Sequence, residues 1–129
     1  MTANRYRDFQ AGLALCTKTV LDEFESDMVY YINFLTYITS LCDCWGLTTP
    51  PIVPDIGIMA GSDIIAIEKA SMDAIKTENF IQNGIPKTHE LGSEGHLFER
   101  IHGKNPFIQL EELEKLGLGT LEYEIEEVD

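Results

Sequence analysis

The sequence has few basic residues, and this shortage excludes several classes of partner. Nine Lys and Arg residues stand against 22 Asp and Glu residues, which gives a formal net charge of −13 at pH 7. A surface of this sign repels nucleic-acid phosphates and anionic lipid headgroups, whereas it attracts cations and basic protein surfaces. We therefore expect no nucleic-acid partner and no membrane partner.

Long apolar runs and a disulfide framework are also missing. No segment approaches the roughly 18 apolar residues that a membrane-spanning helix needs. Residues 1–8 carry charges that no apolar run follows, which does not fit a signal peptide. The three cysteines are an odd number and too few for a disulfide framework. These absences predict a soluble protein of the reducing cytoplasm.

Phosphate-binding glycine motifs and paired histidines are absent as well. Neither the dinucleotide fingerprint nor the P-loop motif occurs, so Gly57 and Gly61 are interpreted as turn residues. His96 and His102 are six residues apart and do not share a helix face. Together with His89 they are interpreted as surface or packing residues rather than metal ligands.

What the sequence does contain is enough apolar material for one compact domain, since 44% of its 129 residues are hydrophobic. The first expected element is a helix at about residues 6–25, because apolar side chains recur there every three or four positions. These side chains are Phe9, Leu13, Cys16, Val20 and Phe24. Such a stripe predicts that one side of the helix faces the protein core.

Two strands and a second helix are expected next. Residues 28–38 are rich in aromatic and β-branched side chains, which predicts a strand covered on both faces. A loop over 39–54 leads to a strand over 55–60 and a helix over 63–76, whose first turn Ser62 or Asp63 would cap. C-terminal helices and a strand over 121–128 complete a single domain over residues 1–129. The predicted fold class is α/β, with a small mixed sheet flanked by helices.

The most distinctive chemical feature is Cys42-Asp43-Cys44 in the loop over 39–54. Two thiolates one residue apart can ligate a soft metal ion, and Asp43 or Asp55 can add an oxygen ligand. The candidate metal ligands are therefore Cys42, Asp43, Cys44 and Asp55. Structural metal sites usually draw four ligands, with two residues between paired cysteines. Because cysteine is also among the residue types most often buried, buried cysteines without a metal are the competing interpretation.

Asp55 stands between two apolar residues, Pro54 and Ile56. A carboxylate buried there would need a hydrogen bond, an ion pair or a metal ion. Backbone amides at the start of the following helix would satisfy it without any metal. The sequence leaves a structural and a functional role for Asp55 equally open.

Several segments, taken in order, resemble one known family. They are YINFLTYIT at 31–39, CDC at 42–44, IVPDIGI at 52–58 and DIIAIEKA at 63–70, followed by HGKNPFIQL at 102–110, LGLG at 116–119 and EYE at 122–124. These segments are similar to successive motifs of the uncharacterised iron–sulfur-centre proteins of the domain-of-unknown-function 362 family. The resemblance runs from about residue 9 to the end of the sequence.

The resemblance implies an incomplete, C-terminal portion of a larger α/β fold. Family members are longer, with a preceding α/β portion and, in many, a ferredoxin-like segment whose cysteines bind iron–sulfur clusters. This sequence contains neither, so an iron–sulfur cluster is not expected in this chain alone. A sheet edge or helix face left uncovered would find a partner, either a second copy of the chain or the missing N-terminal or ferredoxin-like portion.

Three functions are compatible with these observations. The first is a redox-associated domain whose Cys42-Asp43-Cys44 loop binds a metal ion. The second is a non-catalytic scaffold or interaction module with buried cysteines. The third is a small-molecule enzyme domain with Asp55 at a pocket. The sequence names neither a substrate nor a reaction.

Overall fold

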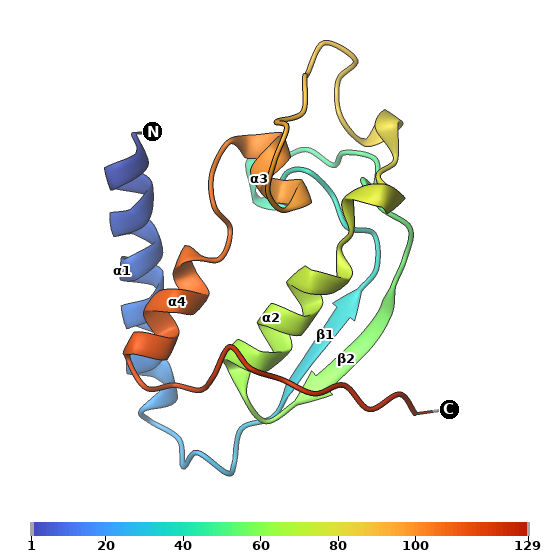
Figure 1. Cartoon of the computed structure of the whole chain (residues 1–129). Coiled ribbons are helices and arrows are strands. Elements are labelled where there is room, and N and C mark those ends of the chain that lie inside the picture. Colours follow the sequence, from blue (N-terminus) through green and yellow to red (C-terminus); the bar gives the residue numbers. More distant parts are fainter. Residues whose placement is uncertain (1, 129) are drawn as a thin grey trace. The chain divides into compact units, whose positions relative to one another are not determined.

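Helices and two short strands make up the regular structure of the chain (Figure 1). The structure, a computed structural model, describes residues 2–128, apart from the side chain of Asp43. The predicted α/β class is confirmed. The elements in chain order are α1 (Ala3–Leu21), β1 (Tyr31–Leu35), η1 (Asp43–Trp45), β2 (Gly57–Gly61), α2 (Ile64–Ala74), η2 (Thr77–Asn79), η3 (Gln82–Gly84), α3 (Leu97–His102) and α4 (Ile108–Lys115), where η marks a short 3-10 turn.

The chain divides into two compact units. Unit 1 comprises the residues up to Asn33, Met59–Asp73 and the residues from Phe107 onward, and unit 2 comprises Phe34–Ile58 and Ala74–Pro106. Each unit has its own nearly inaccessible side chains, Ile65 and Leu113 in unit 1 and Ile52 and Leu97 in unit 2. The single domain expected over residues 1–129 therefore contains two packed groups of elements.

The first helix, α1, buries a different side from the predicted one. Ala14 is completely buried, and α1 packs against α4. The predicted core-facing stripe is exposed instead, with Phe9 at 53% and Val20 at 59% of their full accessibility. Periodicity revealed an apolar stripe, but in the described part of the chain α1 meets α4 through the small Ala14 on its other side. The helix also ends at Leu21, so Phe24 lies in the turn beyond it.

The core of unit 1 joins three helices. Ala14 of α1, Ile65 of α2 and Leu113 of α4 form one buried apolar cluster. The N-terminus of α2 is fixed by Asp63, whose Oδ1 accepts the N–H groups of Ile65 at 2.8 Å and Ala66 at 3.0 Å. The predicted capping role of Asp63 is thereby confirmed, and it orients α2 over the sheet.

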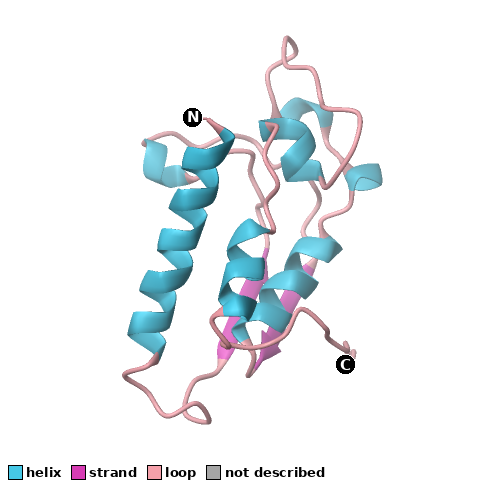
Figure 2. Ribbon diagram, turned by 60° about the vertical axis from the view of Figure 1, so that its left-hand side comes forward, coloured by secondary structure: helices cyan, strands magenta, loops and turns pink. Residues whose placement is uncertain are grey.

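The sheet consists of β1 and β2, which run in opposite directions (Figure 1). On its inner face, Asn33 Nδ2 of β1 donates to Glu68 Oε1 and to Ser71 Oγ of α2, both at 3.0 Å. Figure 2 shows α2 lying across the two strands. One face of the sheet is therefore covered by α2.

The outer face of this sheet is exposed. Ile32 and Phe34 of β1 are 56% and 67% accessible, and Ile58 of β2 is 63% accessible. The prediction that the strand over 28–38 is covered on both faces is therefore wrong. Apolar side chains lie on both faces of the strand, but the described elements supply a helix for only one face.

The C-terminal segment does not form the predicted strand over 121–128. These residues have no strand partner within the described part of the chain and no regular structure. The alternation of apolar and acidic residues has a different basis, since Tyr123 turns inward and its hydroxyl donates to Asp73 Oδ2 at 2.8 Å. This hydrogen bond raises the pKa of Tyr123 above its ordinary value.

Across residues 2–128, no helix has the length and apolar character to cross a membrane.

Leu113→Ala tests the core of unit 1. Leu113 is 1% exposed, and its truncation would leave a cavity between α1, α2 and α4. We expect the free energy of unfolding to fall by about 2–5 kcal/mol, as measured by urea denaturation. Leu15→Ala is the matched control, because Leu15 is 57% exposed and its loss should cost no more than about 0.5 kcal/mol. Equal losses in the two variants would contradict this assignment of the core.

Candidate functional site

The cysteine loop of unit 2 is closed at its base by main-chain contacts. Thr39 and Pro51 form an isolated antiparallel bridge, and the N–H of Ile52 donates to the carbonyl of Ile38 at 2.8 Å. Ile52 is itself fully buried. The residues between 39 and 51 therefore project from a fixed base rather than from a flexible chain.

Within this loop, η1 brings the two cysteines into one turn. The N–H of Trp45 donates to the carbonyl of Cys42 at 3.1 Å, and Gly46 follows with a φ of 78°. A positive φ of this size suits glycine because other residues would place Cβ too close to the backbone. The turn over Asp43–Trp45 thus ends at Gly46.

Cys42 and Cys44 are both exposed, and a hydrogen bond from a main-chain amide to a side-chain sulfur links them. The N–H of Cys44 donates to Cys42 Sγ at a distance of 3.3 Å. The thiolate is the form of cysteine that binds metal ions. The turn therefore presents both sulfur-bearing residues at the surface.

The described residues do not complete a metal site around these two sulfurs. No group of three or more His, Cys, Asp or Glu side chains lies close enough together to hold a metal ion, as far as the structure describes them. The side chain of Asp43 lies outside this description, and Cys16 is an exposed residue of α1 in unit 1. A typical four-ligand site would thus need ligands beyond Cys42 and Cys44.

Asp55 is exposed and has a local structural partner. Its Oδ1 accepts the N–H of Tyr37 at 2.7 Å. Tyr37 has a φ of 50°, which is a left-handed conformation that disfavours a bulky side chain. The carboxylate of Asp55 therefore stabilises the strained residue that follows β1, and it does so from the segment that leads into β2.

A cavity of about 360 Å³ lies beside Asp55 in unit 2. Among the described residues, its lining includes Lys76 and Asn79 in addition to Asp55, but no cysteine. The remaining lining residues are Val53, Pro54, Ile56 and Ala74. Asp55 therefore lines this cavity, whereas Cys42 and Cys44 are not among its described lining residues.

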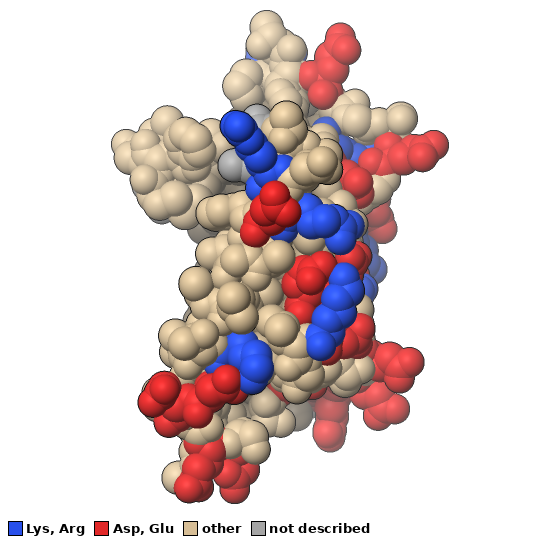
Figure 3. All heavy atoms as spheres, turned by 90° about the vertical axis from the view of Figure 1, so that its left-hand side faces the viewer, with Lys and Arg blue, Asp and Glu red and all other residues tan. Residues whose placement is uncertain are grey.

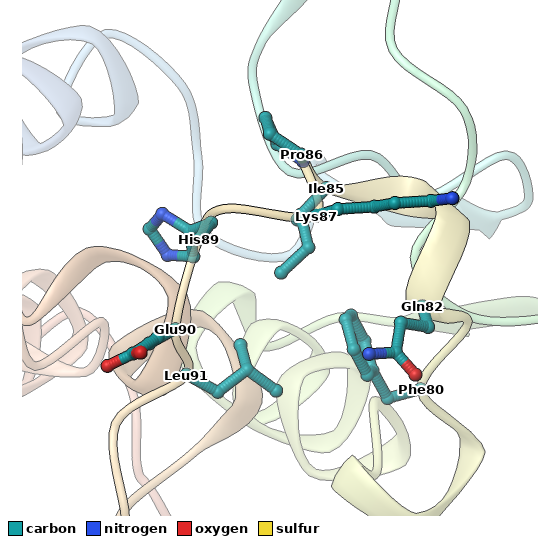
Figure 4. A pocket seen from close by; sticks show the side chains of 8 residues that line it. All are labelled: Phe80, Gln82, Ile85, Pro86, Lys87, His89, Glu90 and Leu91. Carbon is teal, nitrogen blue, oxygen red and sulfur yellow. The ribbon is translucent and has the colours of Figure 1, made fainter.

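A second cavity, of about 390 Å³, lies in the segment between η2 and α3 (Figure 4). Apolar side chains of Phe80, Ile85 and Leu91 extend toward its centre, whereas Glu90 points away. Its size is within the range of small-molecule pockets, but those pockets also place a few polar groups so that they converge on the ligand. The described lining offers no such convergence.

The three histidines of unit 2 hold main-chain segments together. His102 Nε2 is hydrogen-bonded to the carbonyl of Ser40 at 2.8 Å, and His89 Nε2 to the carbonyl of Ile101 at 2.8 Å. His96 Nδ1 accepts the N–H of Phe98 at 3.2 Å and caps α3. The contact of His102 matters most for the site, because Ser40 precedes Cys42 by two residues.

Sequence reasoning did not identify His102 as a support for the cysteine loop. The two partners are separated by 62 residues, and no local spacing connects them.

Comparisons of the chain with known protein families, with curated proteins and with solved structures find no match.

Asp55→Ala tests the structural role of this carboxylate. The variant removes the acceptor for the Tyr37 N–H, so we expect the free energy of unfolding to fall by about 1 kcal/mol. Asp55→Asn keeps an oxygen acceptor without the charge, and most of the stability should return. Urea denaturation of both variants would show this difference. If Asp55→Asn lost as much stability as Asp55→Ala, the negative charge rather than this contact would be the important property.

Proposed function

We propose that the chain is a redox-associated domain related to the uncharacterised iron–sulfur-centre proteins, and that its Cys42-Asp43-Cys44 turn binds a soft metal ion. The observation that supports this proposal most directly is the hydrogen bond from the Cys44 N–H to Cys42 Sγ in an exposed turn. Two sulfurs presented at the surface by a fixed loop can be reached by a metal ion, whereas buried structural cysteines cannot.

The chemistry of the donors defines the kind of metal ion. Thiolate sulfur prefers zinc, copper(I) and iron to magnesium or calcium. Two sulfurs fill half of a tetrahedral coordination sphere, and Asp43 and Asp55 are the oxygen donors that the sequence offers nearby along the chain. We propose that the remaining ligands come from a second polypeptide, either another copy of this chain or a separate cluster-bearing protein.

The negative surface and the thiols fit this role in a reducing compartment, which we propose to be the cytoplasm. The formal charge of −13 attracts cations and disfavours anionic partners. A reducing compartment keeps cysteines as thiols rather than as disulfides. An iron–sulfur cluster held by this chain alone is not part of the proposal, because such clusters usually need four cysteines.

An interaction module is the second candidate function. It is supported by the exposed apolar outer face of the sheet, formed by Ile32, Phe34 and Ile58. The expectation that such a module would bury its cysteines is wrong, because Cys16, Cys42 and Cys44 are all exposed. The enzyme alternative has weaker support, because Oδ1 of Asp55 is already engaged by Tyr37.

Metal titration of the reduced protein under anaerobic conditions tests the proposal. We expect added Co²⁺ or Cd²⁺ to produce sulfur-to-metal charge-transfer absorption in the wild type. This absorption should disappear in the Cys42→Ser/Cys44→Ser variant, because the thiolate donors are removed. Circular dichroism would establish that the variant keeps its fold.

Cys16→Ser is the matched control for this titration. Cys16 is also exposed, but it lies on α1 and outside the proposed turn. The control should retain the full charge-transfer signal. The proposal fails if the double variant binds as much metal as the wild type, or if Cys16→Ser loses the signal to the same extent.

A further inference from the structure

An apolar stripe runs along the exposed side of α1. It is formed by Phe9, Leu13, Cys16 and Val20, which are separated by four, three and four residues. Phe9, Leu13 and Val20 are 53%, 37% and 59% accessible, and Cys16 is exposed. Alternating steps of three and four residues are the 3.5-residue repeat of a helix that pairs with another helix. The other side of α1 is already occupied, because Ala14 is buried against α4.

The two ends of α1 carry opposite charge. Arg5 and Arg7, with one carboxylate, Asp8, lie in its first turns, whereas Asp22, Glu23 and Glu25 follow its last turn. Part of this charge is neutralised within the chain, since Arg7 pairs with Glu112 and Lys18 pairs with Asp22. The exposed Arg5 and Glu23 remain at opposite ends of the stripe. Figure 3 looks onto the side where α1 lies and shows a broad uncharged area, with acidic side chains gathered at its lower end.

We propose that this stripe is a homodimer interface in which α1 pairs with α1 of a second copy in antiparallel orientation. In this orientation the stripe is complementary to itself. Phe9 meets the partner's Val20 and Leu13 meets the partner's Cys16, and both pairs share one midpoint between Ala14 and Leu15. One two-fold axis through that point therefore satisfies every contact, as an isologous interface requires.

The charges select the antiparallel over the parallel arrangement. In the antiparallel pair, the basic first turn of one helix lies beside the acidic end of the other, so Arg5 is near the partner's Glu23. In a parallel pair, the two basic ends would lie side by side, as would the two acidic ends. Opposite helix dipoles add to the same preference. The occupant of this surface is therefore a second copy of the chain, which carries both the apolar pattern and the opposite charge that the stripe needs.

The oligomeric state tests the interface. Sedimentation equilibrium of the wild type at micromolar and higher concentrations should show a dimer. Phe9→Glu and Val20→Glu should each raise the dissociation constant by about tenfold or more, because each variant puts a charge into the apolar seam between the helices. Leu15→Glu is the matched control, because Leu15 is 57% exposed but lies on another side of α1. Circular dichroism would show that the helix content of all three variants is retained.

Two outcomes would overturn the interface. One is a wild-type protein that stays monomeric over the whole concentration range, which would leave the stripe to a different partner. The other is dissociation by Leu15→Glu to the same extent as by Val20→Glu. Metal binding by Cys42 and Cys44 is measured separately, by the charge-transfer titration, so failure of this interface and failure of the proposed function are distinguishable.

Disulfide trapping tests the orientation of the two helices. The background is Cys16→Ser/Cys42→Ser/Cys44→Ser, which carries no thiol. Adding Phe9→Cys and Val20→Cys together places two thiols on one helix that are too far apart to bond within it. With oxidised glutathione as the oxidant, the doubly substituted protein should form a covalent dimer, and neither single substitution should. Efficient cross-linking of a single substitution would show parallel helices and overturn the antiparallel pairing.

Discussion

The carboxylate of Asp63 holds two parts of unit 1 in place. One of its oxygens caps α2, and the other accepts the N–H of Thr120 at 3.0 Å, which fixes the segment after α4. Because α2 supplies both the polar contacts to Asn33 and the buried Ile65, its placement determines the inner face of the sheet and the packing of the helices. Gly119 allows the Asp63 carboxylate to approach this segment, since a Cβ at position 119 would collide with the carboxylate.

Local patterns in the sequence predicted the type of the main elements but not what would cover them. The spacing of Phe9, Leu13 and Val20 identifies a helix with an apolar side, and the composition around Phe34 identifies a strand. Burial depends on a second element, and the described part of the chain places α4 on the other side of α1 and a helix on only one side of β1. Continuous hydrophobicity in Ile32 and its neighbours therefore could not reveal which face would be open.

In the candidate site, too, the local features could be predicted from the sequence, whereas the contacts between distant residues could not. Cys42 and Cys44 were recognisable because two thiols one residue apart are visible in the sequence itself, and the turn between them is a local structure. The contacts that fix the loop join Thr39 to Pro51 and Ser40 to His102. These residues are far apart in the sequence, so no local sequence pattern predicts the contacts. Asp55 was harder to predict because its apolar neighbours suggested burial, whereas its actual partner is the amide of Tyr37.

The base of the cysteine loop is closed by contacts of the chain itself. Ordering a residue costs about 1–2 kcal/mol in backbone entropy, and here the bridge at Thr39 and the buried Ile52 already impose that order without any ion. Small zinc domains behave in the opposite way, because the metal supplies their folding energy. If the loop binds a metal ion as proposed, a chelator would therefore remove the ion without unfolding the chain, since Thr39, Pro51 and Ile52 hold the base of the loop.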